Sequence, residues 1–272
     1  FKGIVTELLW FLQGRTDLKY LIDNDCNIWT GDAYANFCKS HTIPPSNPGG
    51  PLLSDNLPSN RPIQSSKEEF INKIKTDDEF AKRFGDLGKI YGFQWRNWGG
   101  TKTDGFHEYE SNGYNENIKG IDQIQKLIND LKSNPDSRRL MLNSWNVEQL
   151  PEMVLPPCHY GFQIYTRELS VQERWASCKN EIDVDDPNLH QKLDNLNIPK
   201  RAISLMWNQR SCDFALGIPF NIASYALLLE IIAKSVNMIP EDLIGNLGDC
   251  HIYINQIDGV REQLTRQPYP LP

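Results

Sequence analysis

Apolar residues recur at helical spacing in several stretches of the chain. Residues 4–13 are apolar around one acidic side chain, Glu7, and they predict a buried helix that ends at Gly14. Residues 121–133 carry isoleucines and leucines three or four positions apart, which predicts a helix with one apolar face. Residues 222–236 give the strongest helical pattern of the chain. Two further helices are predicted over residues 18–24 and 68–84.

Shorter apolar runs predict strands, which cover residues 139–145, 160–165, 202–207 and 248–254. Polar stretches rich in Gly or Pro predict loops over residues 41–62 and 99–117. Residues 177–199 are acidic and show no apolar period, so we expect an insertion that separates two strands at the surface. This order of elements favours an α+β fold with one mixed sheet, in a single domain over residues 1–272.

Composition and charge narrow the class of protein. The chain carries a net charge of -7, with 39% hydrophobic and 23% charged residues, as is ordinary for a soluble globular protein. The acidic balance gives no general attraction to nucleic acid. Glu230 interrupts the longest apolar run, residues 223–233, and no run reaches the roughly 20 residues of a membrane span. The chain begins at Phe1 without a signal-peptide pattern and ends on Pro272 without a closing element, so we expect both ends to be truncated.

The cysteines are spread along the chain without a C-x-x-C pair, so the usual zinc and dithiol redox motifs are absent. Without a secretory signal we expect reduced thiols and a cytoplasmic protein. Most cysteines in proteins are inert, buried small side chains, so one at most need be catalytic. The six are Cys26, Cys38, Cys158, Cys178, Cys212 and Cys250.

The sharpest local signal is the segment 155–159, which reads Leu-Pro-Pro-Cys-His. Two prolines fix the backbone in front of Cys158. A nucleophilic cysteine acts as the thiolate and needs a nearby cation, for which Arg138, Arg139 and Arg210 are the candidates. The alternative is a structural cysteine where a loop enters the strand at residue 160.

Two further segments carry polar side chains suited to a nucleotide. In segment 208–213, Arg210 lies beside Gln209 and Ser211, and a planar guanidinium suits a phosphate group. Asn221 follows at the edge of the strongest predicted helix. Its amide both donates and accepts, which suits the edge of a base, and capping of the helix is the alternative.

A fourth segment, residues 248–253, carries His251 and Tyr253 two positions apart on a predicted strand, where both point to one face. They either bind a sugar hydroxyl or form a half-buried pair.

Taken in order, the four segments resemble those of the thymidylate synthases. The other stretches that carry the resemblance are residues 7–14, 28–29, 91–96, 135–139, 144–147 and 266–272.

The resemblance implies a thymidylate synthase-like fold, in which helices flank a mixed β-sheet and one sheet face is used for dimerisation. It implies reductive methylation of dUMP to dTMP, with 5,10-methylenetetrahydrofolate as the donor of the one-carbon unit and the hydride. No metal is implied. Cys158 corresponds to the nucleophile that adds to C6 of the pyrimidine, which splits one difficult step into easier ones.

The resemblance also assigns the groups around the nucleophile. Glu7 corresponds to the carboxylate that organises water for proton transfer, and its apolar setting favours a raised pKa. Tyr91 corresponds to the tyrosine implicated in removing the C5 proton. His159 and Gln209 match polar residues around the nucleophile and the base. Asp213 matches a folate-binding aspartate, which we count among the catalytic residues as well.

The resemblance implies that dUMP is held by two subunits of a homodimer. Arg210 and Ser211 correspond to phosphate ligands of the same subunit, and Arg138 and Arg139 to phosphate ligands of the neighbouring one. Asn221 corresponds to the reader of the uracil O4 and N3 edge. The remaining correspondences are His251 and Tyr253 for the deoxyribose 3′ hydroxyl, and Ile28 and Trp29 for apolar folate contacts.

The sequence departs from the family pattern in three places. The family's N-terminal segment, whose arginine grips the phosphate, and its C-terminal segment, which closes over the folate, are absent from residues 1–272. A second tryptophan that is usual shortly after Trp29 is also absent.

Two alternatives stay open. A dUMP hydroxymethylase shares the fold, although its dCMP-specific form has Asp where this chain has Asn221. An RNA-binding or inactive relative fits less well with the net acidity and the complete set of site residues.

Overall fold

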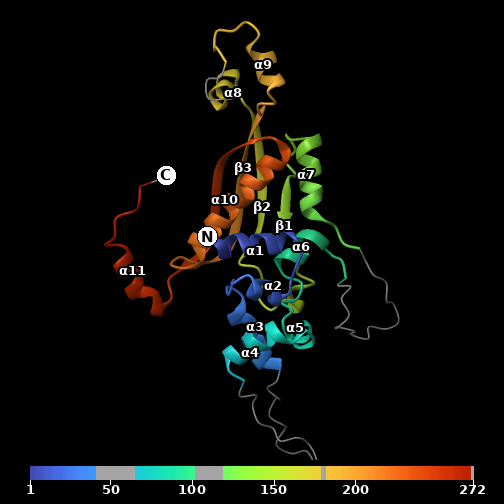
Figure 1. The fold of residues 1–272 in the computed structure, drawn as a ribbon, viewed down its shortest axis with the longest axis vertical. Coiled ribbons are helices and arrows are strands. Elements are labelled where there is room, and N and C mark those ends of the chain that lie inside the picture. The colour runs from blue at the N-terminus through green and yellow to red at the C-terminus, as the bar shows by residue number, and fades with distance from the viewer. Residues whose placement is uncertain (41–64, 102–118, 179–181, 271–272) are drawn as a thin grey trace, which may run out of the picture.

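A four-stranded mixed sheet lies at the centre of the computed structural model, which describes residues 1–40, 65–101, 119–178 and 182–270 (Figure 1). Neighbouring strands β1-β2 and β2-β3 are antiparallel, and β3-β4 are parallel. The strands are β1 (Met141–Asn143), β2 (His159–Glu168), β3 (Arg201–Asp213) and β4 (Ile239–His251). The predicted α+β fold with one mixed sheet is confirmed.

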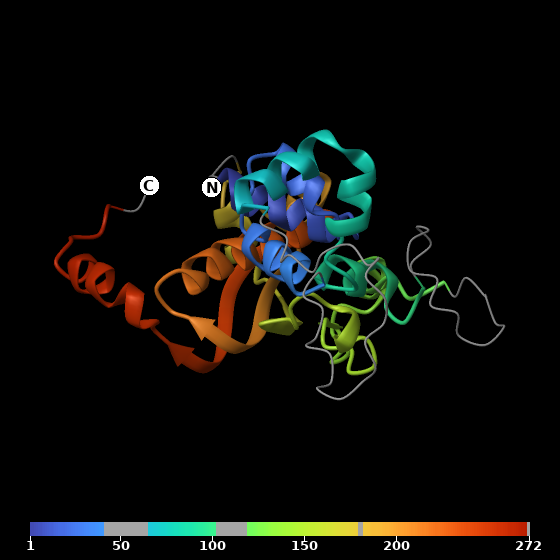
Figure 2. The ribbon, with the colours of Figure 1, turned by 90° about the horizontal axis from the view of Figure 1, so that it is seen from below.

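Helices cover one face of the sheet (Figure 2). α10 (Gly217–Val236) packs on β3 and β4, and α1 (Lys2–Leu12) and α7 (Gln123–Ser133) pack against α10. Phe162, Leu205 and Trp207 point from the strands into this layer and are buried. The other helices are α2 (Leu18–Asp23), α3 (Thr30–Ser40), α4 (Lys67–Thr76), α5 (Asp78–Phe84), α6 (Tyr91–Asn97), α8 (Val171–Ser177), α9 (Leu189–Asn195) and α11 (Ile257–Gln263), with short 3-10 turns η1 (Leu150–Glu152) and η2 (Ile254–Gln256).

The helices predicted from periodicity are found, with one correction. α1 ends as predicted, because Gly14 adopts a left-handed backbone with φ of 72° that favours glycine. The single helix predicted over residues 68–84 is wrong, because α4 and α5 are separated at Asp77. Asp77 has extended backbone angles, and its side chain accepts from the N–H of Phe80, so it caps the start of α5.

Three strands extend beyond a predicted end, whereas β1 is shorter than the strand predicted over residues 139–145, which is therefore wrong at both ends. β3 continues through the polar residues 208–213, and β4 starts at Ile239 rather than at residue 248. In β3 nearly every position is at least partly buried, so polar and apolar residues do not alternate clearly. β4 lies at the edge of the sheet and is mostly exposed, so it lacks the apolar alternation that marks a half-buried strand. The loop predicted over residues 41–62, and residues 102–117 of the second predicted loop, lie outside the described residues.

The insertion predicted over residues 177–199 does separate two strands, β2 and β3, and part of it is helical (Figure 1). It contains α9, and α8 leads into it. Cys178, Leu189 and Leu193 form a small separate core between these helices. Arg174 is buried beside this core and donates to Asp194 at 2.7 Å. A core of so few residues leaves only a weak apolar period in the sequence.

Among the described helices, α10 is long and apolar enough to cross a membrane by length and composition. Its buried residues, which include Tyr225, Leu228 and Ile232, face the sheet and the neighbouring helices. The central helix of a folded domain meets the same compositional test, so this helix is weak support for a membrane span.

Candidate active site

The segments that carry most of the predicted site residues meet at one end of the sheet. The parallel strands β3 and β4 end at Asp213 and His251, which are register partners. Because β2 is antiparallel to β3, its first residue lies at the same end, where His159 pairs with Gln209. α10 starts at Gly217, just after the turn that follows β3. The topology therefore gathers side chains that are far apart in the sequence.

Hydrogen bonds on two sides fix the backbone of Cys158. Its N–H donates to the hydroxyl of Tyr91 at 2.7 Å, and its carbonyl accepts from the N–H of Arg210 at 2.8 Å. The guanidinium of Arg210 donates from Nε to the carbonyl of Pro157 at 2.9 Å and from Nη2 to that of Pro156 at 3.1 Å. The two prolines hold φ nearly constant, so the loop that carries the thiol and the arginine beside it form one rigid unit.

The thiol of Cys158 lies near one positive side chain. Burial raises the pKa of this thiol, the charge of Arg210 lowers it, and the carboxylate of Asp32 raises it. The net direction is upward, so the thiol is mainly protonated in the free protein at neutral pH. Of the three arginines that the sequence offered as the cation, Arg210 fills this role, whereas Arg138 and Arg139 do not act on the thiol within one chain.

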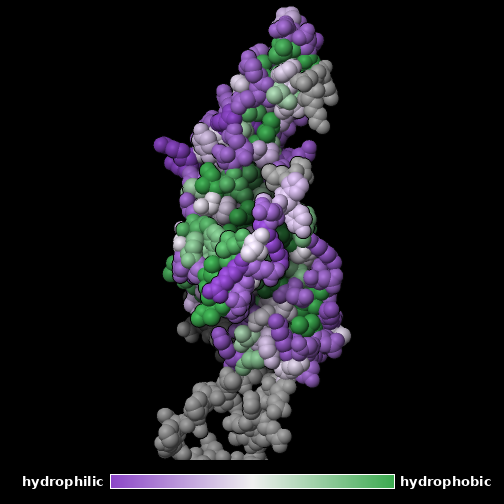
Figure 3. All heavy atoms as spheres, turned by 90° about the vertical axis from the view of Figure 1, so that its left-hand side faces the viewer, coloured by the Kyte–Doolittle hydropathy of each residue, from purple (hydrophilic) through white to green (hydrophobic). Residues whose placement is uncertain are grey.

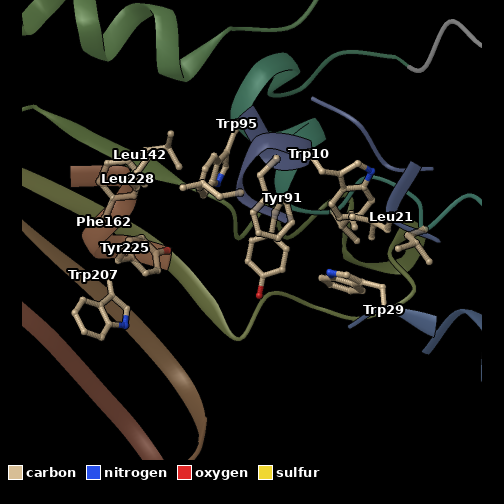
Figure 4. Packing of buried hydrophobic residues seen from close by; sticks show 14 of the residues in the cluster. Trp10, Leu21, Trp29, Tyr91, Trp95, Leu142, Phe162, Trp207, Tyr225 and Leu228 are labelled. Atoms are coloured by element: carbon tan, nitrogen blue, oxygen red, sulfur yellow. The ribbon is translucent and has the colours of Figure 1, made fainter. Parts of the chain in front are cut away.

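A row of aromatic contacts includes Tyr91, whose hydroxyl accepts from the N–H of Cys158; Figure 4 shows its members Trp29, Tyr91, Tyr225 and Trp207. Tyr91 lies 6.0 Å from Trp29 and stacks on His159 at 4.3 Å between ring centroids. His159 meets Tyr225 edge to face, and Tyr225 stacks on Trp207 at 5.4 Å. Nδ1 of His159 lies 2.9 Å from the hydroxyl of Tyr225. Burial lowers the pKa of His159 to about 3, so this ring is neutral and held in one orientation.

Glu7 is a titratable carboxyl group in a largely apolar place. Its Oε1 accepts from the indole N–H of Trp29 at 2.7 Å. Burial raises the pKa of Glu7 to about 7, although the hydrogen bond from Trp29 lowers it, so the raised pKa expected from the sequence is confirmed. Trp29 is buried and packs on Trp10, while Ile28 is 43% exposed. Near neutral pH, Glu7 therefore exists both as an acid and as a base.

Gln209 orients the amide of Asn221. Nε2 of Gln209 donates to Oδ1 of Asn221 at 3.0 Å and to the backbone carbonyl of Ser211 at 2.9 Å, and its Oε1 accepts from the indole of Trp207. The NH₂ group of Asn221 has no acceptor among the described residues, so it is available to a ligand. Asn221 lies in the second turn of α10, whose N-cap is Leu216, so the alternative of helix capping is wrong.

Asp213, His251 and Tyr253 lie together where β3 and β4 end. The carboxylate of Asp213 accepts from Nε2 of Gln256 at 3.1 and 2.9 Å. The rings of His251 and Tyr253 meet edge to face, with centroids 5.0 Å apart. β4 ends at His251, so the strand predicted over residues 248–254 is wrong for Tyr253, which lies just beyond it. The predicted proximity of the two rings is nevertheless found.

Arg138 and Arg139 lie far from the nucleophile of their own chain. Both are exposed and precede β1. Leu140 lies between them and β1, and its carbonyl accepts from the N–H of Ile164 on β2. Ile164 lies six residues from Cys158 along an extended strand. At about 3.3 Å per residue, this separation is about 20 Å. Within one chain the structure therefore does not bring the two arginines to the site.

Three side chains at the site are not singled out by sequence patterns. The ring of Trp145 lies 5.2 Å from the guanidinium of Arg210, Tyr225 binds His159, and Gln256 holds Asp213. Tyr225 follows Asn221 by four residues, so it lies one helical turn away. That spacing is a signal which could have found it. Trp145 lies in the stretch 144–147 that carries the family resemblance, which could have found it, whereas Gln256 comes from the segment after β4 and leaves no comparable pattern.

The arrangement combines a thiol, a fixed guanidinium, an oriented amide and a carboxyl group that titrates near neutral pH. Such a set can add sulfur to an electron-poor ring, bind an anion, read the edge of a base and move a proton. Within the described ranges, no group of three or more His, Cys, Asp or Glu side chains lies close enough to hold a metal ion.

Known proteins that are similar to this chain share one description. A sequence profile of thymidylate synthase matches residues 1–272. The chain is 40% identical over 266 residues to a thymidylate synthase of Mycoplasma genitalium. The aligned region covers 98% of this chain and 68% of that protein. It is 38% identical to thymidylate synthases of Mycoplasma pneumoniae and Listeria monocytogenes, over 100% of this chain and 70% and 72% of theirs. With a family profile that spans every residue and relatives matched along the whole chain, this chain belongs to the thymidylate synthase family.

Proposed function

We propose that the site around Cys158 converts dUMP to dTMP, as expected of a methyltransferase of the thymidylate synthase family. The co-substrate, 5,10-methylenetetrahydrofolate, supplies the one-carbon unit and the hydride. The observation that carries the proposal is the convergence of the Cys158 thiol, the Arg210 guanidinium and the oriented Asn221 amide at one end of the sheet.

Cys158 acts as the nucleophile in this proposal. As a thiolate it adds to C6 of the uracil ring, so an S–C6 bond forms and electron density moves to C5, which can then attack an electrophilic carbon. The raised pKa of the free thiol means that few molecules carry a thiolate before substrate binds. The charge of Arg210 lowers the pKa of the thiol and therefore favours the thiolate.

The same arginine is suited to the phosphate of dUMP. Its guanidinium is held by Pro156 and Pro157 and lies against Trp145, so its position is set before substrate arrives. Ser211 follows it on β3, and His251 and Tyr253 lie at the end of the neighbouring strand. These groups would bind the phosphate and the 3′ hydroxyl, respectively.

Asn221 is suited to uracil. With its Oδ1 toward Gln209 and its NH₂ group free, it can donate to O4 of the base, and Oδ1 retains a lone pair for N3–H. Glu7 and Tyr91 supply the proton-transfer groups. The pKa of Glu7 at about 7 suits it to exchange protons through water near O4 and C5.

A folate ring system would lie beside Asp213. The carboxylate of Asp213, held by Gln256, can accept from N–H groups of the pterin. Phe214 and Leu216 follow it with 52% and 61% of their surface exposed, and apolar surface is gathered in the middle of this side of the molecule (Figure 3). Exposed apolar residues beside a polar anchor suit a flat aromatic ligand. Trp29 is buried, so it supports the site chiefly through Glu7.

The outer face of the sheet would join two chains in a homodimer. Met141, Met206 and Ile244 lie in one row across the strands, on the face opposite the helices. Met141, Ile244 and the nearby Tyr165 are 58%, 47% and 66% exposed, beside a shallow hollow of about 510 Å³. Exposed apolar side chains on a regular sheet favour a packed interface. Such a dimer gives Arg138 and Arg139, which lie far from their own site, a role at the partner's site.

Tritium release from 5-tritiated dUMP, with methylenetetrahydrofolate and the full-length protein, tests this function. Release that depends on the folate, with a product of the mass of dTMP, is the expected result. A product heavier by a hydroxyl oxygen would identify a hydroxymethylase instead. Cys158→Ala is the control, because it removes the nucleophile and should abolish release. Absence of release from the intact protein would contradict the proposal.

A further inference from the structure

Two thiols lie opposite each other beside the candidate site. Cys212 of β3 and Cys250 of β4 are register partners, one residue before the partners Asp213 and His251. Adjacent strands lie about 4.8 Å apart, which falls within the range of about 4.4–6.8 Å between Cα atoms that a disulfide spans. Residues paired directly across two strands also point to the same face. The two cysteines therefore have the placement of a potential bridge, and both are free in the structure.

The two thiols differ in their access to solvent. Cys250 is exposed and Cys212 is fully buried. Burial and the neighbouring thiol of Cys250 raise the pKa of Cys212 to about 11, so Cys212 stays protonated and reacts slowly with an oxidant by itself. Cys250 is the thiol that an oxidant reaches first, and Cys212 is placed to react with the product.

We propose that Cys212 and Cys250 form a reversible disulfide site, oxidised by a peroxide and reduced by small thiols. Hydrogen peroxide transfers one oxygen to the sulfur of Cys250, which gives a sulfenic acid and one water. The sulfur of Cys212 then attacks this sulfur, and its proton leaves with the displaced hydroxide as a second water. The two thiols lose two electrons, and the peroxide gains them. Exchange with a reducing thiol restores both side chains.

The bridge would act on the residues around it. Ser211 and Asp213 flank Cys212 on β3, and His251 directly follows Cys250 on β4. Closing the bridge imposes an S–S bond of about 2.05 Å and a dihedral angle of about 85–100° on the two paired positions, which twists the strand ends and displaces these side chains. The oxidised protein therefore binds dUMP less tightly than the reduced protein. This effect rests on the proposed function, whereas the bridge itself does not.

Mass spectrometry of the full-length protein tests the bridge. The protein carries Cys158→Ser, so that the candidate nucleophile cannot be oxidised. After treatment with hydrogen peroxide and N-ethylmaleimide, we expect two peptides joined through Cys212 and Cys250, and separate peptides after dithiothreitol. The variant Cys250→Ser, changed at an exposed position, should lack the joined peptides. Alkylation of both cysteines after peroxide, or bridges only between other cysteines, would overturn the proposal.

Calorimetric titration with dUMP tests the effect on the site. In the Cys158→Ser protein we expect peroxide to lower the affinity and dithiothreitol to restore it. In Cys158→Ser with Cys250→Ser, peroxide should leave the affinity unchanged. Equal affinity of the bridged and reduced proteins would overturn the effect. Failure of the reduced protein to bind dUMP would instead count against the proposed function, with the mapped bridge unaffected.

Discussion

Burial of a single carboxyl group, that of Glu7, links proton binding to stability. Its pKa is about 7 in the folded protein, against an ordinary value of 4.5, so folding favours the protonated form. The resulting stabilisation is complete below about pH 4.5, and it is lost as the pH rises through 7. We expect Glu7→Gln, which keeps the neutral form and an acceptor for Trp29, to lose less stability than the unchanged protein between about pH 5 and about pH 8.

Urea unfolding of both proteins at the two pH values measures this difference. The comparison cancels the titration of other groups, because both proteins share them. An identical change in the free energy of unfolding would contradict the raised pKa of Glu7.

In the proposed function, Asn221 determines the choice of base. Cytosine presents a donor at C4 and an acceptor at N3, so both contacts that suit uracil become mismatched. Unpaired buried polar groups cost about 1–3 kcal/mol each, which gives roughly tenfold to ten-thousandfold discrimination for two. We expect Asn221→Asp to reverse the preference, because a carboxyl group can accept from the cytosine amino group and, when protonated, donate to N3.

Comparison of kcat/KM for dUMP and dCMP measures the change of preference. Asn208→Asp is the matched control: it makes the same substitution on β3, where Asn208 accepts from Asn246 and does not contact Asn221. If the unchanged protein processed both nucleotides equally, Asn221 would not be the reader of the base.

Residues with a chemical signature in the sequence could be predicted, and those that act through others could not. Glu7 in an apolar run, the Pro-Pro-Cys segment before β2, and the Arg-Ser pair at 210 and 211 carry their chemistry in their neighbours. Tyr225 is an unremarkable apolar position of a helix until its hydroxyl meets His159. That contact depends on how α10 packs on β2, which local patterns do not encode.

At the scale of elements, Asp77 divides one helical pattern into two helices. Its backbone is extended, and its carboxylate accepts from the N–H of Phe80 at 2.9 Å, which caps α5. We expect Asp77→Ala to lower the free energy of unfolding by about 1 kcal/mol, the usual cost of losing such a cap. Chemical unfolding measures it. Asp78→Ala is the control at the next residue. The side chain of Asp78 is exposed, and its ion pair with Lys19 is long, at 3.8 Å.

A loss for Asp78→Ala as large as that for Asp77→Ala would contradict the role of the cap.

The periodicity over residues 68–84 could not reveal the break, because helical spacing of apolar residues continues across Asp77. Likewise, the length of β3 follows from its place between β2 and β4, because β2 pairs with β3 as far as Gln209 and β4 pairs with it as far as Asp213.

At the scale of the whole molecule, the proposed site takes residues from two chains. Arg139 is about 20 Å along the sheet from its own Cys158, so the phosphate-binding role proposed for it requires a second chain. Mixing Arg139→Ala chains with Cys158→Ala chains should restore activity, because one of the two sites in each hybrid is intact. Random exchange gives about half hybrids and therefore about a quarter of full activity, measured by tritium release.

The control for this experiment mixes Cys158→Ala chains with chains that carry both substitutions, which leaves no intact site. Subunit exchange is confirmed separately, with two differently tagged chains. If exchange occurs without recovery of activity, the sites are not shared.

The proposed function depends above all on attack of Cys158 on C6 of the pyrimidine, and trapping of the covalent adduct tests this step. Fluorine at C5 of 5-fluoro-dUMP cannot leave as a proton does, so the reaction stops with the sulfur still bound to the ring. The full-length protein is incubated with this analogue and methylenetetrahydrofolate, digested, and mapped by mass spectrometry. We expect one ternary adduct, on the peptide that contains Cys158. An adduct on Cys212 or Cys250, or turnover of dUMP without any trapped adduct, would contradict it.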